Sequence, residues 1–182
     1  MIHLEKMLMI GATGRNSGKT ELAVQLIKKF SVSNTIVGLK VSTYYKGDSQ
    51  FHGQNETPLE GNFSIIKDTD QSTDKNTARM LNANAKDVYW MRTKIEFLEE
   101  AFNEFSKLVG DNAFIVCESN SLRKAIKPGL FLMIVNNVNS EIKLTASDVI
   151  EFADKKIEFS GTSFLNFSID EICIRNQKWA LC

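Results

Sequence analysis

Residues 11–20, Gly-Ala-Thr-Gly-Arg-Asn-Ser-Gly-Lys-Thr, combine glycines, a lysine and a threonine in a spacing suited to binding phosphate. A P-loop has a glycine, four further residues and then Gly-Lys-Ser or Gly-Lys-Thr, placed between a strand and a helix. Residues 18–20 match the end of this pattern, whereas Thr13 stands where the first glycine is expected and Gly14 follows it. We interpret the segment as a P-loop variant; the alternative is a glycine-rich turn that only starts a helix.

Each part of such a loop has an expected role. Backbone N–H groups at the start of a helix attract anions, because they are unpaired and lie at the positive end of the helix dipole. The residues expected to bind the nucleotide in this way are Gly14, Arg15, Asn16, Ser17, Gly18, Lys19 and Thr20. We expect Lys19 to bridge the β- and γ-phosphates and the Thr20 hydroxyl to coordinate Mg²⁺.

A P-loop also needs an acidic partner for the metal, usually at the end of a neighbouring buried strand. Glu118 directly follows the apolar run at 114–117. It is predicted to be a catalytic acid, either as a ligand in the Mg²⁺ shell or as the group that orients the attacking water. The alternative is an ordinary solvated acid at the end of a strand.

Further polar residues follow other predicted strands. Lys40 ends the second strand, where ligands bind in open parallel sheets, and is either an anion contact or a solvated lysine. Asp68 and Asp70 are interpreted as loop or capping acids rather than metal ligands. The guanine signature Asn-Lys-x-Asp is absent, so base recognition is assigned to Asn136 or Asn137, with a turn role as the alternative for Asn137 and Asn139.

The elements that must position these residues alternate between short apolar runs and segments of helical period. This alternation predicts an α/β fold, a three-layer α/β/α P-loop NTPase with a mostly parallel sheet. Strands are predicted over 7–10, 35–41, 88–91, 114–117, 130–135 and 156–159, and helices over 19–30, 77–85, 95–109 and 146–153. Residues 1–182 are expected to form one domain with a variable loop or hairpin at about 44–76. No helix or strand is predicted for the tail 167–174.

Composition limits the function classes. The 182 residues include 43% hydrophobic residues, with 22 Lys plus Arg balanced by 22 Asp plus Glu, so no overall field favours nucleic acid or an anionic membrane. Cys117, Cys173 and Cys182 lack metal-ligand spacing, and neither a disulfide nor a zinc site is expected. With no signal peptide and no apolar run of spanning length, a cytoplasmic protein without nucleic-acid or membrane partners is predicted.

Several segments together resemble one family. The loop at 14–20 resembles that of the molybdopterin-guanine dinucleotide biosynthesis protein B family, in which Asn-Ser-Gly-Lys-Thr is common. The strand at 37–40 ends in lysine as in that family, and the segment 76–88 is similar to its helix before the third strand. Glu118 matches the glutamate that closes its next core strand, so the resemblance covers roughly residues 7–136.

The resemblance implies a homodimeric GTP-binding accessory protein for attaching a nucleotide to the molybdenum cofactor. Two departures concern its substrate: Val41 replaces the family's histidine, and Ser119 replaces its glycine. The leading hypothesis is therefore a weak Mg²⁺-dependent NTPase that binds GTP or ATP and serves a molybdopterin-type cofactor or a partner enzyme. A small-molecule kinase and a non-catalytic nucleotide switch are the alternatives.

Overall fold

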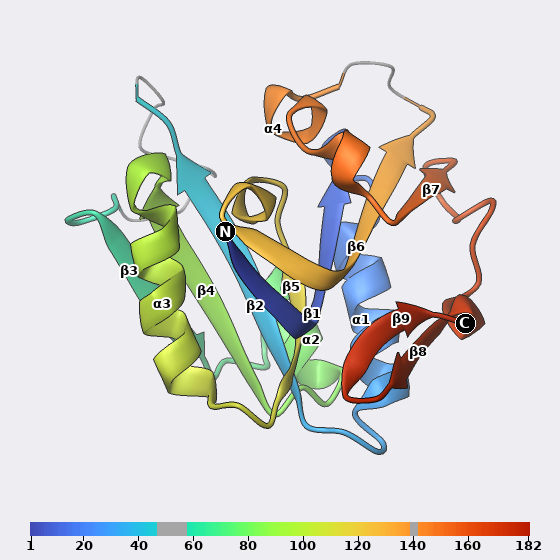
Figure 1. The fold of residues 1–182 in the computed structure, drawn as a ribbon, viewed down its shortest axis with the longest axis horizontal. Helices are drawn as coiled ribbons and strands as arrows, with labels where there is room; N and C mark the ends of the chain where they lie inside the picture. Colours follow the sequence, from blue (N-terminus) through green and yellow to red (C-terminus); the bar gives the residue numbers. More distant parts are fainter. Residues whose placement is uncertain (47–57, 139–141) are drawn as a thin grey trace.

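A computed structural model describes residues 1–46, 58–138 and 142–182. Its main sheet has seven strands in the order β3-β4-β2-β5-β1-β6-β7 (Figure 1). The strands are β1 Ile2–Ala12, β2 Ile36–Tyr44, β3 Phe63–Asp68, β4 Asp87–Lys94, β5 Phe114–Glu118, β6 Ile126–Asn136 and β7 Lys155–Phe159. Only the β3–β4 pair is antiparallel. The predicted α/β class with a mostly parallel sheet is confirmed.

Helices flank both faces of this sheet. They are α1 Lys19–Phe30, α2 Asn76–Asn82, α3 Leu98–Val109 and the short α4 Leu144–Ser147, with 3-10 turns η1 Ile95–Phe97, η2 Ser121–Lys124, η3 Ile150–Phe152 and η4 Ile169–Glu171. On one face, α1 and α2 pack against apolar side chains such as Leu8, Ile10 and Val116. On the other face, α3 and α4 pack against alternate residues of the same strands, such as Met9 and Cys117. Successive strand residues point to opposite faces, so each central strand contributes to both cores.

The apolar stripes predicted from the sequence are the buried faces of the helices. In α1 the buried residues are Leu22, Ala23, Leu26, Ile27 and Phe30. In α3 they are Leu98, Ala101, Phe102 and Phe105. Gly110 follows α3 with φ of 72°, a backbone conformation that glycine adopts without steric cost.

Two secondary-structure predictions made from the sequence differ from the structure. The helix predicted over 146–153 is wrong as one element: α4 and η3 are separate turns, because Val149 leaves helical dihedrals at φ −131° and ψ −7°. Within the segment expected to be a loop or hairpin, residues 63–68 form edge strand β3, which pairs with the later strand β4. Residues 47–57 of that segment lie outside the described residues.

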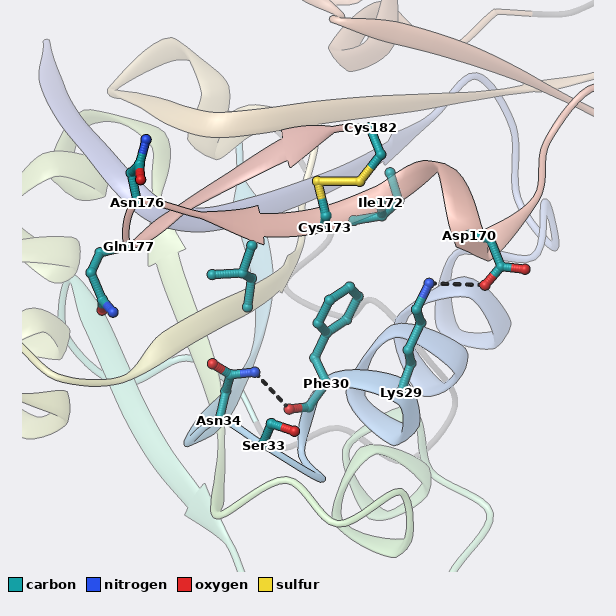
Figure 2. A pocket seen from close by; sticks show the side chains of 11 residues that line it. Lys29, Phe30, Ser33, Asn34, Asp170, Ile172, Cys173, Asn176, Gln177 and Cys182 are labelled. Atoms are coloured by element: carbon teal, nitrogen blue, oxygen red, sulfur yellow. Dashed lines mark hydrogen bonds and ion pairs between the residues drawn. A yellow bond between two sulfur atoms is a disulfide. The ribbon is translucent and has the colours of Figure 1, made fainter.

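The tail forms a second, two-stranded sheet of β8 Ile172–Arg175 and β9 Lys178–Leu181. Asn176 and Gln177 connect them with φ of 51° and 61°, as a type I′ hairpin turn requires. Figure 2 shows the Cys173–Cys182 disulfide that closes this hairpin, with a Cα–Cα distance of 5.9 Å. The expectation of no disulfide is therefore wrong, because strand pairing brings together two cysteines that lack any motif spacing.

Trp179 joins the hairpin to the main core. Its side chain is 2% exposed and makes edge contacts with Phe30 of α1 and Phe114 of β5, at ring-centroid distances of 4.8 and 5.7 Å. Its indole N–H donates to the Lys6 carbonyl at 3.1 Å. The Lys29–Asp170 ion pair, at 3.1 Å, adds a contact between α1 and the segment before β8 (Figure 2).

In the described part of the chain, no helix is both long and apolar enough to cross a lipid bilayer.

We expect Trp179→Ala to lower the free energy of unfolding by about 3–5 kcal/mol, as for other buried aromatic residues truncated to alanine. Urea titration followed by circular dichroism measures this loss. Leu181→Ala, at a side chain that is 40% exposed on the same strand, is the matched control and should cost less than about 1 kcal/mol. Equal effects of the two substitutions would show that the hairpin is not part of the core.

Candidate functional site

The loop between β1 and α1 has the backbone conformation that its sequence requires at two positions. Asn16 has φ of 51° and Gly18 has φ of 77°, and asparagine and glycine are the residues that tolerate this region best. A side chain at position 18 would also lie 3.0 Å from the ring of Phe159. Gly18 is the residue before α1, so the loop ends directly at the helix N-terminus.

Thr13, which occupies the place of the expected first glycine, has a structural role that glycine could not fill. Its side chain is 1% exposed, and its hydroxyl accepts a hydrogen bond from the backbone N–H of Asn136 at 3.0 Å. Its own N–H donates to the Ile134 carbonyl at 2.9 Å, and its carbonyl accepts from the N–H of Lys143 at 3.0 Å. Because Thr13 does not have a positive φ, no glycine is needed there.

Asn136 supports the same loop with its side chain. Its amide nitrogen donates to the Ser17 hydroxyl at 3.2 Å, and its amide oxygen accepts from the N–H of Val138 at 2.9 Å. Gly14 lies against this amide, since a Cβ at position 14 would be 3.3 Å from the Asn136 nitrogen. The side chain assigned to base recognition is therefore engaged with the loop.

The side chain of Asn120 hydrogen-bonds to the backbone at the end of β1. Its side-chain oxygen accepts from the N–H of Ala12 at 2.8 Å, and its nitrogen donates to the Ala12 carbonyl at 3.0 Å and to the Thr145 hydroxyl at 3.3 Å. Gly11 permits this approach, because a Cβ there would lie 2.7 Å from the Asn120 oxygen. The paired contacts link β1, the turn after β5 and α4 next to the loop.

A cavity of about 770 Å³ lies at the carboxyl ends of the parallel strands, the usual position of ligands in open α/β sheets. Its charged lining residues are Arg15, Lys19, Lys40, Lys143, Glu118 and Asp148. Polar residues Asn16, Ser42, Thr43, Asn76, Ser119, Asn120, Ser121 and Thr145 also line it. A space of this size is typical of small-molecule sites.

The lining is predominantly positive. Among the described residues, no carboxylate lies within ion-pair distance of the four cationic side chains, and Asp148 is already paired with Lys124 at 2.6 Å. Burial lowers the pKa of Lys19, the charge of Glu118 opposes that shift, and the charge of Lys40 adds to it. Burial, with Lys19 and Arg15 nearby, lowers the pKa of Lys143 to about 8.

Glu118 is the buried acid of this cavity. It is 4% exposed and ends β5, where its register partners are Ile10 of β1 and Lys40 of β2. Its Oε1 atom is buried and accepts no hydrogen bond from any described residue. Because an unpaired buried carboxylate oxygen is costly, this atom has the capacity to bind a metal ion or a water.

The structure places the sequence-predicted residues in two groups. Arg15, Asn16, Lys19 and Glu118 line the cavity. Gly14, Ser17, Gly18, Thr20 and Asn136 form the loop and its support without being part of that lining. The sequence predicts Lys40 at the end of the second strand, but β2 continues to Tyr44 because its residues 41–44 pair with β4. Lys40 lies in the cavity with its ammonium 5.7 Å from the ring centroid of Trp90.

Other residues had no identifiable signal in the sequence. Asn120 and Lys143 reach the site only through contacts between distant segments. Asp68 is the last residue of β3 rather than a loop residue, and it accepts from the Thr77 hydroxyl. Asp70 lies in the loop that follows and accepts from the N–H of Ser72 at 2.9 Å.

Comparison of the chain with protein-family models, with curated proteins and with solved structures returns no match.

We expect Asn120→Ala to lower the free energy of unfolding by about 1–3 kcal/mol, because the partly buried N–H and carbonyl of Ala12 lose their partners. Amide hydrogen exchange should show the loss of protection at Ala12 itself. Asn103→Ala, at an exposed position of α3, is the control. Unchanged exchange at Ala12 would contradict the role given to Asn120.

Proposed function

We propose that this chain binds a nucleoside triphosphate, GTP or ATP, together with Mg²⁺ in the cavity described above, and that it is a weak NTPase. The observation that carries the proposal is the charge arrangement: four cationic side chains without ion-pair partners among the described residues surround one buried carboxylate. Cations gathered at low dielectric repel one another, so the arrangement favours an anionic ligand.

The loop geometry supports a phosphate as that anion. Gly18 places the loop backbone at the start of the 12-residue helix α1, where unpaired N–H groups and the helix dipole favour negative charge. Lys19 extends from the first position of this helix into the cavity. In this proposal the backbone of residues 14–20 holds the β-phosphate and Lys19 bridges the β- and γ-phosphates.

The donor set also fits Mg²⁺. This ion prefers oxygen ligands and is commonly held by one or two protein groups together with substrate phosphates. Glu118 supplies a buried oxygen without a partner, and Thr20 supplies a hydroxyl in the first turn of α1. When bound, Mg²⁺ would neutralise charge on the phosphates. The carboxylate of Glu118 would either hold the metal's shell or orient the attacking water.

The resemblance of the loop, of the segment 37–40 and of Glu118 to the molybdopterin-guanine dinucleotide biosynthesis protein B family supports a role for this NTPase. We propose that it assists assembly of a molybdopterin-type cofactor, as a homodimer or with a partner enzyme. Lys40, in the middle of β2, lies in the cavity, which is compatible with that role.

A small-molecule kinase is the second candidate, and one observation favours it. The cavity extends past the loop along Ser42, Thr43 and Ser121, so its lining exceeds what a triphosphate contacts through the loop alone. A phosphoryl acceptor could bind there. Incubation with radiolabelled ATP distinguishes the candidates, because a kinase transfers label to a metabolite whereas an NTPase releases it as inorganic phosphate.

We expect Lys19→Ala to weaken binding of a magnesium triphosphate roughly 10- to 150-fold, the loss typical of one hydrogen bond to a charged group. Isothermal titration calorimetry with GTP and with ATP measures the affinities. Lys28→Ala, an exposed lysine of the same helix, is the matched control and should bind like the wild type. If Lys19→Ala binds as tightly as the control, the proposed phosphate site is incorrect.

A further inference from the structure

Lys143 is fixed beside the loop by a backbone contact at its own position and by a contact two residues later. Its backbone N–H donates to the carbonyl of Thr13 at 3.0 Å. Two residues later, the Thr145 hydroxyl accepts from the side-chain nitrogen of Asn120 at 3.3 Å. These contacts do not involve the lysine side chain, so the backbone places that side chain at the cavity independently of what its ammonium binds.

Among the residues that the structure describes, no ion pair involves the ammonium of Lys143, whereas lysines nearby have carboxylate partners. Lys124 pairs with Asp148 at 2.6 Å and Lys155 pairs with Glu171 at 2.5 Å. Lys143 instead lines the cavity together with other cations, and Asp148, directly after α4, is paired with Lys124. Repulsion of this kind is relieved when an anion binds between the cations.

We propose that Lys143 is a second phosphate-contacting residue, which binds the terminal phosphoryl group and so selects nucleoside triphosphates over diphosphates. This inference rests on the proposed function. Lys19 is expected at the β- and γ-phosphates, and Lys143 lies close enough to interact electrostatically with it. Lys143 lines the same cavity as Glu118 and Asn120, and Thr145, two residues after Lys143, accepts a hydrogen bond from the Asn120 side chain.

A cation at this position has a chemical consequence. Charge accumulates on the terminal phosphoryl oxygens as the bond to the leaving group breaks, and a positioned Lys or Arg stabilises it. Lys143 supplies this cation from the same chain. It is held by contacts to Thr13, directly after β1, and to Asn120, directly before η2, rather than by a separate activating protein.

The selectivity test uses calorimetry with the β,γ-imido analogues of GTP and ATP, and with GDP and ADP, all with Mg²⁺. Lys143→Met should lose about tenfold or more in affinity for the triphosphate analogue and little for the diphosphate. Lys143→Arg should retain most of the triphosphate preference, because the charge is kept. Lys127→Met, at an exposed lysine near the other end of β6, is the matched control.

A second measurement follows the proton on Lys143. Among the described residues, the charged groups that share the cavity with it are Arg15 from the loop, Lys19 from α1, Lys40 from β2, Glu118 from β5 and Asp148 after α4. With a pKa of about 8 in the free protein, Lys143 is half protonated at pH 8, and a bound phosphate raises its pKa. Triphosphate binding should then take up about half a proton through Lys143, and more at slightly higher pH.

Isothermal titration calorimetry in buffers of different ionisation enthalpy measures the number of protons taken up when the triphosphate binds. The uptake should fall in Lys143→Arg, whose side chain stays protonated. If Lys143→Met lowers triphosphate and diphosphate affinity equally, or lowers neither, while Lys19→Ala weakens binding as expected, this inference fails and the proposed function stands. If the wild type binds no triphosphate, both are overturned.

Discussion

The arrangement of charge around Glu118 is the constraint on which the rest of the site depends. Parallel pairing brings Ile10, Glu118 and Lys40 into register on adjacent strands, so the buried carboxylate at the end of β5 lies beside a lysine from the middle of β2. The loop after β1 and the start of α1 add further cations to the same cavity. Like charges gathered in a partly buried cavity oppose folding, and the surrounding structure must hold them in place.

Hydrogen bonds between segments that are distant in the sequence hold the loop and the neighbouring strand ends in place. The Asn120 side chain hydrogen-bonds to the backbone at the end of β1. Thr13 accepts hydrogen bonds from the backbone N–H groups of Asn136 and Lys143, and the Asn136 side chain donates to Ser17. This explains why the first glycine of the usual pattern is dispensable here: the buried threonine hydroxyl is part of the support. A preorganised loop of this kind loses little entropy when it binds a ligand.

How much the sequence predicted depends on whether the determining contacts are local. Helices α1 and α3 and the buried strand β5 follow from periodicity within a few residues, and the loop from its motif. Strand β3 and the C-terminal hairpin depend on partners far along the chain or on a two-residue turn, so composition alone does not reveal them. Lys143 has no local signal at all, since only the fold brings it to the loop.

The most direct test of a nucleotide and metal site is a crystal structure with Mn²⁺ and a non-hydrolysable triphosphate. Mn²⁺ substitutes for Mg²⁺ on oxygen ligands and is located by its anomalous scattering. The proposed function predicts an anomalous peak between the Thr20 hydroxyl and the Glu118 carboxylate, with the phosphates cradled by residues 14–20. A triphosphate bound elsewhere, or a metal distant from both side chains, would contradict it.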